Sequence, residues 1–127
     1  MDSYIDKKMQ IKRSNTILYC KKWSETVAFY RDIFDFEMSF QNDWFVEFQI
    51  TADSFLSVAD ESRATIDSVD GQGVTLAWQV EDIQTIRDKL IVKDVGVTEI
   101  KKRWGSLVVY LHDPENHRIE LWQEVYK

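Results

Sequence analysis

Apolar and polar residues alternate so regularly along two stretches of the chain that each stretch predicts a β-strand. Between positions 43 and 50 the apolar residues are Trp44, Val46, Phe48 and Ile50. Positions 106–112 show the same alternation. Successive side chains of a strand point to opposite faces of its sheet. We therefore expect two sheets, each with one apolar face packed on a helix and one face left free.

The elements around these stretches repeat in one order: strand, helix and three further strands. In the first half we expect strands at 15–20, 36–40, 43–50 and 55–59, with a helix that Ser24 caps and that runs to about Phe34. In the second half we expect strands at 75–80, 97–103, 106–112 and 118–123, with a helix that Asp82 caps. This order predicts an α+β fold of two βαβββ modules, with mixed curved sheets and helices on the outer faces.

One domain suits a chain of 127 residues. We divide it into a polar N-terminal extension (1–13), a first module (14–60), a linker (61–73) and a second module (74–124). Two of the four glycines lie in the linker, which is otherwise polar.

Charge and composition narrow the class of function. The net charge of −6 disfavours nucleic acid as a partner, because phosphate binding needs a basic face. It mildly favours a cationic ligand, although acidity also keeps a protein in solution. No apolar run is long enough to cross a membrane, and the polar N-terminus lacks the apolar core of a secretory signal, so we expect a cytoplasmic protein.

One cysteine and two histidines belong to residue types that often act in catalysis or bind metals, but we expect none of the three to do so here. Cys20, the single cysteine, lies between apolar neighbours on a predicted strand, where a buried and unreactive thiol is expected. His112 and His117 lie beside the last hairpin turn, and we expect both at the surface. The chain shows no Gly-rich phosphate loop, nucleophile elbow or plausible Cys–His pair.

Three segments resemble the glyoxalase, bleomycin-resistance and extradiol dioxygenase superfamily, also called the vicinal oxygen chelate fold. Positions 28–36 (AFYRDIFDF) are similar to its "aFYrdvLGF" segment, and positions 76–82 (LAWQVED) to its "iaFxVdD" segment. Positions 113–121 (DPENHRIEL) are similar to its "DPdGnxiEl" turn and strand. In that turn Asn116 replaces the usual glycine at a left-handed position, which Asn tolerates well. The resemblance spans roughly 14–124 and implies the two-module fold.

The resemblance also implies four metal-ligand positions, usually His, Glu, His and Glu. In this chain they fall on Asn15, Ser57, Thr75 and Glu120. Only Glu120 keeps a usual ligand type, because an amide oxygen and two hydroxyls bind transition metals weakly. We therefore expect neither a metal ion nor another cofactor.

Strand parity collects aromatic and polar side chains on the free faces of the two sheets. The candidate ligand-binding residues are Tyr19, Phe45, Glu47, Phe55, Ser57, Trp104, Tyr110, Glu120 and Trp122. They predict a concave, aromatic-lined cavity that attracts planar or cationic groups. The alternative is that these aromatic rings fill the cavity themselves and nothing binds.

The two glutamates of this set each have more than one interpretation. Glu47 lies in a WFVEF strand similar to the "WvEF" strand of metal-free bleomycin-resistance proteins, and its alternative is a solvated partner of Arg or Lys. Glu120 is a former metal ligand, a hydrogen-bonding group of the pocket, or a partner of Arg118 or a lysine.

Three functional hypotheses follow. The first is a metal-free protein, similar to the bleomycin-resistance type, that sequesters a small aromatic or cationic molecule. The resemblance implies a symmetric homodimer with sites at its junction, and open sheet edges favour such pairing. The second is a glyoxalase-, epimerase- or thiol-transferase-type enzyme with an atypical metal site. The third is a structural or regulatory domain without a pocket.

Overall fold

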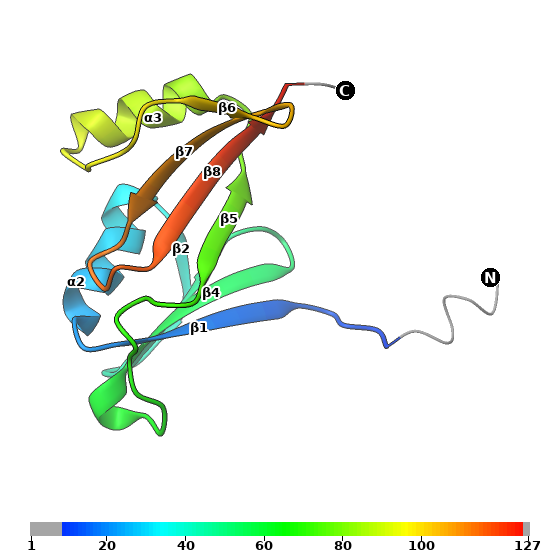
Figure 1. Cartoon of the computed structure of the whole chain (residues 1–127). Helices are drawn as coiled ribbons and strands as arrows, with labels where there is room; N and C mark the ends of the chain where they lie inside the picture. Colours follow the sequence, from blue (N-terminus) through cyan, green and yellow to red (C-terminus); the bar gives the residue numbers. More distant parts are fainter. Residues whose placement is uncertain (1–8, 126–127) are drawn as a thin grey trace.

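The computed structural model describes residues 9–125, and Figure 1 shows its two modules. The first contains β1 (Ser14–Cys20), α2 (Trp23–Ala28), a π-helical turn η1 (Phe29–Ile33), β2 (Glu37–Gln41), β3 (Phe45–Gln49) and β4 (Ser54–Asp60). A short 3-10 turn, η2 (Glu61–Arg63), begins the linker. The second contains β5 (Thr75–Gln79), α3 (Ile83–Val92), β6 (Lys101–Arg103), β7 (Ser106–His112) and β8 (Arg118–Glu124). The predicted α+β fold of two βαβββ modules is confirmed.

Each module forms a four-stranded mixed sheet. The strand orders are β1-β4-β3-β2 and β5-β8-β7-β6, with β1 parallel to β4 and β5 parallel to β8. The remaining neighbours are antiparallel. The registers correspond: Glu47 pairs with Ser57 in the first sheet, as Tyr110 pairs with Glu120 in the second.

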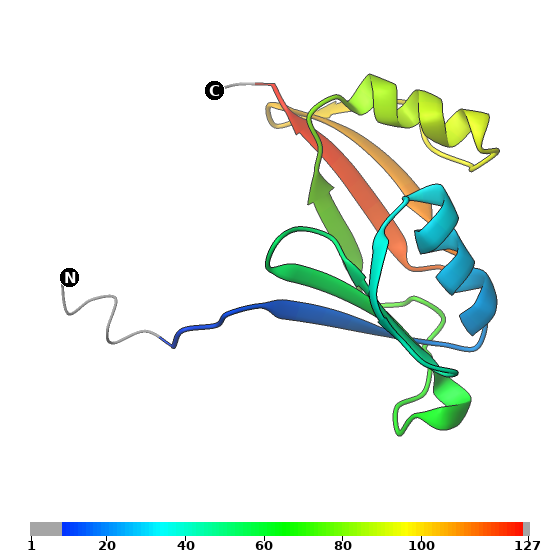
Figure 2. The same ribbon diagram turned by 180° about the vertical axis from the view of Figure 1, so that it is seen from behind.

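The inner faces of both sheets share one hydrophobic core. It contains Val46, Phe48, Leu56 and Val58 from the first sheet and Val109, Leu111, Ile119 and Leu121 from the second. Figures 1 and 2 show α2 and α3 along the same flank of the molecule. Lys93, just after α3, donates to the carbonyl oxygens of Asp32 and Ile33 at 2.9 Å. Because the inner faces meet in one core, the outer faces point away from each other.

The first helix begins differently from the sequence-based expectation. Ser24 was expected to cap it, but the helix starts at Trp23, and Lys22 occupies the N-cap without a side-chain hydrogen bond. The carboxylate of Glu115 instead accepts the backbone N–H groups of Lys21 and Lys22, both at 2.8 Å. A group from the second module has therefore taken the place of the local cap. Asp82 caps α3 as predicted, accepting from the Thr85 N–H.

The sixth strand is shorter than expected. Alternation predicted positions 97–103, but only Lys101–Arg103 pairs with β7. The Tyr110 N–H bonds to the hydroxyl of Thr98 rather than to its carbonyl oxygen. That carbonyl oxygen accepts from Nε of Arg87 on α3 instead. The Thr98 N–H still donates to the carbonyl oxygen of Tyr110 at 3.0 Å, so side-chain partners replace only part of the ladder at this end.

A buried polar network joins the modules and corrects one expectation. His112 is exposed as expected, but His117 is buried. Oδ2 of Asp113 lies 2.6 Å from the Tyr30 hydroxyl, which donates to it, and 2.8 Å from Nδ1 of His117. Burial, with the charge of Asp113, raises the pKa of Tyr30 well above its usual value. The sequence placed His117 in a turn, but no sequence pattern showed that its hydrogen bond to Asp113 holds the turn in the interior.

Cys20 is buried as predicted. Burial and the nearby carboxylates of Glu115 and Asp113 raise its pKa to about 12. Asn116 has a φ of 71°, which confirms the left-handed position expected in the turn. None of the helices within residues 9–125 is long and apolar enough to span a membrane.

Candidate ligand-binding site

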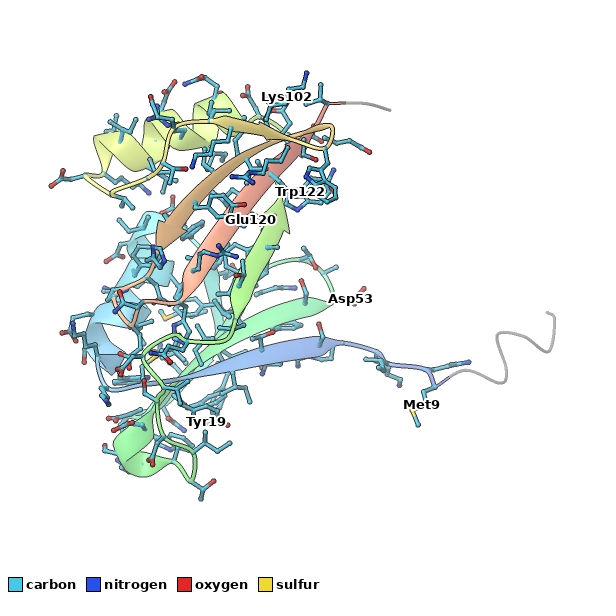
Figure 3. All side chains as sticks on the ribbon, in the orientation of Figure 1. Met9, Tyr19, Asp53, Lys102, Glu120 and Trp122 are labelled. Carbon is cyan, nitrogen blue, oxygen red and sulfur yellow. The ribbon has the colours of Figure 1, made fainter. Side chains whose placement is uncertain are left out.

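The outer face of the second sheet carries a hollow of about 370 Å³. It is lined by Arg103, Trp104, Ser106, Val108, Tyr110, Glu120 and Trp122. This volume is within the range of small-molecule sites. Figure 3 labels Glu120 and Trp122 on β8, in the middle of this sheet. Four of the residues predicted from strand parity therefore lie together: Trp104, Tyr110, Glu120 and Trp122.

Trp104 stands at the tip of the β6–β7 hairpin. The two turn residues, Trp104 and Gly105, have φ values of 55° and 93°, as two-residue hairpin turns with a right-handed twist require. A left-handed backbone costs a tryptophan about 1–2 kcal/mol. The side chain is 99% exposed, so burial in this chain does not offset the cost. The indole is free to contact a ligand or a second molecule.

Glu120 is partly buried in the centre of the hollow. No residue in the described part of the chain forms a hydrogen bond or ion pair with its carboxylate. Arg118 lies on the same face but donates through Nε to the hydroxyl of Thr75 at 2.9 Å. Its guanidinium stands over the Tyr110 ring, 5.0 Å from the ring centre. Pairing of Glu120 with Arg118, one of the three interpretations, is therefore not what the structure shows.

The outer face of the first sheet carries a hydrogen-bonded network instead of an open hollow. Glu47 accepts from Arg13 at 2.8 Å, from Asn15 at 3.3 Å and from Ser39 at 2.8 Å. The guanidinium of Arg13 covers the Phe55 ring at 3.6 Å. Glu47 is thus engaged by partners of its own chain, which is the structural alternative named for it above.

The remaining predicted residues of the first sheet do not reach the hollow. Ser57 is fully buried, and its hydroxyl donates to Asn15 at 2.9 Å. Phe45 contacts the rings of Phe40 and Trp44. Tyr19, labelled at the foot of the first sheet in Figure 3, lies on the other module from Glu120 and Trp122. Within one chain the nine predicted residues therefore form two sets, because the shared core turns the two outer faces apart.

The four positions at which the resemblance implies metal ligands carry donors that suit a transition metal poorly. Asn15 and Ser57 bond to each other, and the Thr75 hydroxyl accepts from Arg118. One amide, two hydroxyls and one carboxylate form a poor donor set for a transition metal. Within residues 9–125 no group of three or more His, Cys, Asp or Glu side chains could hold an ion.

Three arginines of the outer faces were missing from the sequence-based site: Arg13, Arg103 and Arg118. Parity places Arg118 on the same face as Glu120 and Trp122, so the alternation of β8 was a sufficient signal for it. Arg13 had been assigned to the N-terminal extension, and only its contact with Glu47 reveals its place.

Two other hollows fit an aromatic ligand less well. One of about 660 Å³, beside the end of β8, has no aromatic residue in its lining. A groove of about 580 Å³ between the modules includes Phe34, Phe36 and Trp78, but no charged residue lines it. Its rings already pack edge to face, with centres 5.4–5.6 Å apart.

A family model described as a glyoxalase-like domain matches residues 13–125. The chain belongs to this glyoxalase-like family. The family lies within the glyoxalase, bleomycin-resistance and dioxygenase superfamily that the sequence motifs resemble. A search of the curated proteins found no match.

Solved structures similar to this glyoxalase-like protein have several activities in their names. A lactoylglutathione lyase from Agrobacterium tumefaciens is 25% identical, with a TM-score of 0.76 over 91% of this chain and 96% of that one. TnmS3, an antibiotic binding protein from Streptomyces sp. CB03234, is 16% identical, with a TM-score of 0.76 and coverage of 93% and 98%. A glyoxalase/bleomycin resistance protein/dioxygenase from Nocardioides is 14% identical, with a TM-score of 0.76 and coverage of 97% and 89%. The last two likenesses concern the fold alone.

Proposed function

We propose that this protein binds a small aromatic molecule, without a metal ion, in the hollow of the second sheet. The observation that carries the proposal is the convergence of Trp104, Tyr110 and Trp122 around one concave space. Aromatic walls of this kind suit planar ligands. The donor set at the former ligand positions supports the metal-free part of the proposal.

A second copy of the chain completes the cavity in this proposal. The hollow is lined by the second module alone, and the outer face of the first sheet is turned away from it. Apolar side chains of the first sheet remain exposed, including Phe40 at 54% and Ile17 at 39%. A two-fold dimer that sets the first sheet of one copy against the second sheet of the other covers them and closes both cavities.

An enzyme with an atypical metal site is the second candidate function. The carboxylate of Glu120 favours it, since it has no partner among residues 9–125 and stands at the one implied ligand position that keeps a usual ligand type. Metal analysis of the purified protein separates the two candidates. The binding proposal requires no stoichiometric metal. An ion at near-unit occupancy, held by Glu120 with two of Asn15, Ser57 and Thr75, supports the enzyme instead.

Binding itself is tested by a thermal-shift screen with aromatic compounds, because a ligand of the native state raises the unfolding temperature. Each hit is then titrated against the wild type and a Trp122→Ala variant. We expect the variant to lose about 1–3 kcal/mol of binding free energy if Trp122 is a buried anchor of the complex. Trp78→Phe, in the groove between the modules, is the control. A ligand that responds to Trp78 and not to Trp122 binds in the wrong place for this proposal.

A further inference from the structure

Glu120 stands in the middle of the outer face of the second sheet. Tyr110 lies directly opposite it on β7, and Ala77 lies directly opposite it on β5. Trp122 follows it on the same face of β8, because residues two apart in a strand point to the same side. Ala77 is small and exposed, so it cannot cover the carboxylate from the β5 side. Aromatic residues therefore border this carboxylate, which itself lines the hollow.

Neither oxygen of the carboxylate has a partner in the described part of the chain. Arg118 lies on the same face, but its Nε donates to the Thr75 hydroxyl and its guanidinium stands over the Tyr110 ring. Arg103 also lines the hollow, but its partner on β7 is Ser106. Ser106 is four residues from Tyr110, which is about 13 Å along an extended strand. Arg103 therefore stands at the other end of the hollow, and both carboxylate oxygens remain available to a ligand.

The first sheet shows how this fold satisfies a carboxylate on its outer face. The side chain of Glu47 is only 16% exposed. Arg13, Asn15 and Ser39 donate to it at 2.8, 3.3 and 2.8 Å. This arrangement agrees with the rule that charged groups removed from water are hydrogen-bonded. Glu120 receives no such donors within residues 9–125, so a molecule that covers it has to supply them.

The cost of covering Glu120 depends on the edge that the ligand presents to it. An ionised carboxylate accepts hydrogen bonds and donates none. Removal of its water without a replacement donor is unfavourable, and more so for a charged group than for a neutral one. A hydrocarbon edge or a carbonyl group cannot replace that water. Two parallel N–H groups can, because they match the two oxygens in the geometry of a bidentate pair.

We propose that the ligand of the second-sheet hollow is a planar heteroaromatic compound with two adjacent N–H groups on one edge. This inference rests on the function proposed above and names the class of its ligand. The two N–H groups donate to the two oxygens of Glu120, while the ring lies against Trp122 and the exposed indole of Trp104. Cyclic amidines and 2-aminopyrimidinones are compounds with such an edge.

Two probes that share one ring system test the inference. The compound 2-amino-4-quinazolinone has two adjacent N–H groups, whereas 2-methyl-4-quinazolinone has a methyl group in place of the amino group and keeps only one. Both are uncharged near neutral pH, so the nearby charge of Arg118 does not separate them. Titration calorimetry with the full-length protein measures both affinities. We expect the amino compound to bind at least about tenfold more tightly, as for one additional hydrogen bond to a charged group.

Equal affinities of the two probes would overturn the inference. The proposed function stands in that case if both affinities fall in Trp122→Ala, and it fails as well if they do not. If neither probe binds, the inference is again overturned, and the thermal-shift screen then decides the proposed function by itself.

Matched variants assign the preference to Glu120. Glu120→Gln replaces one acceptor oxygen with an NH2 group, so the preference for the amino probe should fall to about twofold or less. Glu124 lies on the same strand and face, but its partner on β7 is Ser106, at the other end of the hollow. Glu124→Gln makes the same change of charge and should keep the preference. The preference is a ratio of two affinities in one protein, so a general loss of stability does not imitate its disappearance. A preference that survives Glu120→Gln, or that disappears equally in Glu124→Gln, overturns the inference.

Discussion

At the scale of single residues, Glu115 contributes more to this fold than its place in an exposed-looking turn suggests. Its carboxylate accepts the N–H groups of Lys21 and Lys22 and the hydroxyl of Ser68. Three segments are thereby joined: the start of α2, the linker and the turn before β8. Burial alone would raise the pKa of Glu115, but these hydrogen bonds outweigh it and leave the pKa below its usual value.

Replacement of Glu115 by Gln should therefore destabilise the protein. The amide keeps one acceptor oxygen but loses the charge and places an NH2 group against backbone donors. We expect a loss of about 1–3 kcal/mol in the free energy of unfolding, measured by urea denaturation. Glu99→Gln, at an exposed residue of the second module, should change it by less than about 0.5 kcal/mol. Equal stability of the two variants would count against a joining role for Glu115.

The same carboxylate gives a pH dependence whose direction follows from its pKa. A carboxyl group with a lowered pKa in the folded state stabilises that state fully above its unfolded pKa, which is about 4.3 for Glu. This stabilisation is lost as the pH falls through the lower, folded-state pKa. The difference in unfolding free energy between wild type and Glu115→Gln should thus be constant near neutrality and shrink in acid. A difference that grows below pH 4 would contradict the sign.

Cys20 should be almost inert toward thiol reagents in the native protein. Its side chain is fully buried and its pKa is about 12, so the reactive thiolate is scarce at neutral pH. We expect the reaction with an aromatic disulfide reagent to be at least about a hundredfold slower in buffer than in denaturant. Rapid native labelling would mean that β1 opens easily.

At the scale of elements, the linker is held by a close approach at Gly71. A Cβ atom added there would lie 2.3 Å from the backbone carbonyl of Asn116, and the residue has a φ of 77°. Gly73 has a similar φ of 82°, but nothing lies within 4 Å of its added Cβ. The two glycines therefore separate the cost of backbone conformation from the cost of a clash.

We expect Gly73→Ala to lose about 1–2 kcal/mol of stability, the cost of a left-handed alanine. Gly71→Ala should lose clearly more, because the turn before β8 must also move. Unfolding curves in urea measure both. Equal losses would show that the contact between linker and turn carries no energy.

The extents of the elements show where sequence patterns are informative. Alternation located β7 at its observed bounds and β8 within one residue, because their inner faces pack on one core. The cap expected at Ser24 and the strand expected along 97–100 were both wrong, because the deciding partners, Glu115 and Arg87, come from distant or neighbouring elements. Local propensity contains no information about such partners.

At the scale of the whole molecule, strand parity predicts on which face of its sheet each candidate residue lies. It does not predict how the two sheets are oriented relative to each other. Trp104, Tyr110, Glu120 and Trp122 lie together at one hollow, since they share one sheet. Tyr19, Phe45 and Phe55 were assigned to the same cavity, although the shared core turns their sheet away. The angle between two sheets depends on packing between modules, which no periodicity in the sequence reports.

The proposed dimer is testable without knowledge of the ligand. We expect sedimentation equilibrium at micromolar concentration to give twice the mass of the 15.1 kDa chain. The physical reason is the coverage of Phe40, Ile17 and Trp104, which are exposed on the single chain. A monomer at these concentrations would mean that the cavities stay half open. Trp104→Ser should weaken self-association if the hairpin tip contacts the second copy.

The shared core also determines how the two repeated modules can separate from each other. Neither module buries its inner face alone, so the two halves should unfold in one cooperative transition despite their similarity. Exchange of modules between chains, a common route to dimers, would first have to separate this core together with the contacts of Tyr30 and Glu115 across it. For a mature dimer such exchange should be as slow as unfolding itself. A dimer that had exchanged modules would therefore keep its partner for the lifetime of the native state, whereas a dimer of intact chains can dissociate without unfolding.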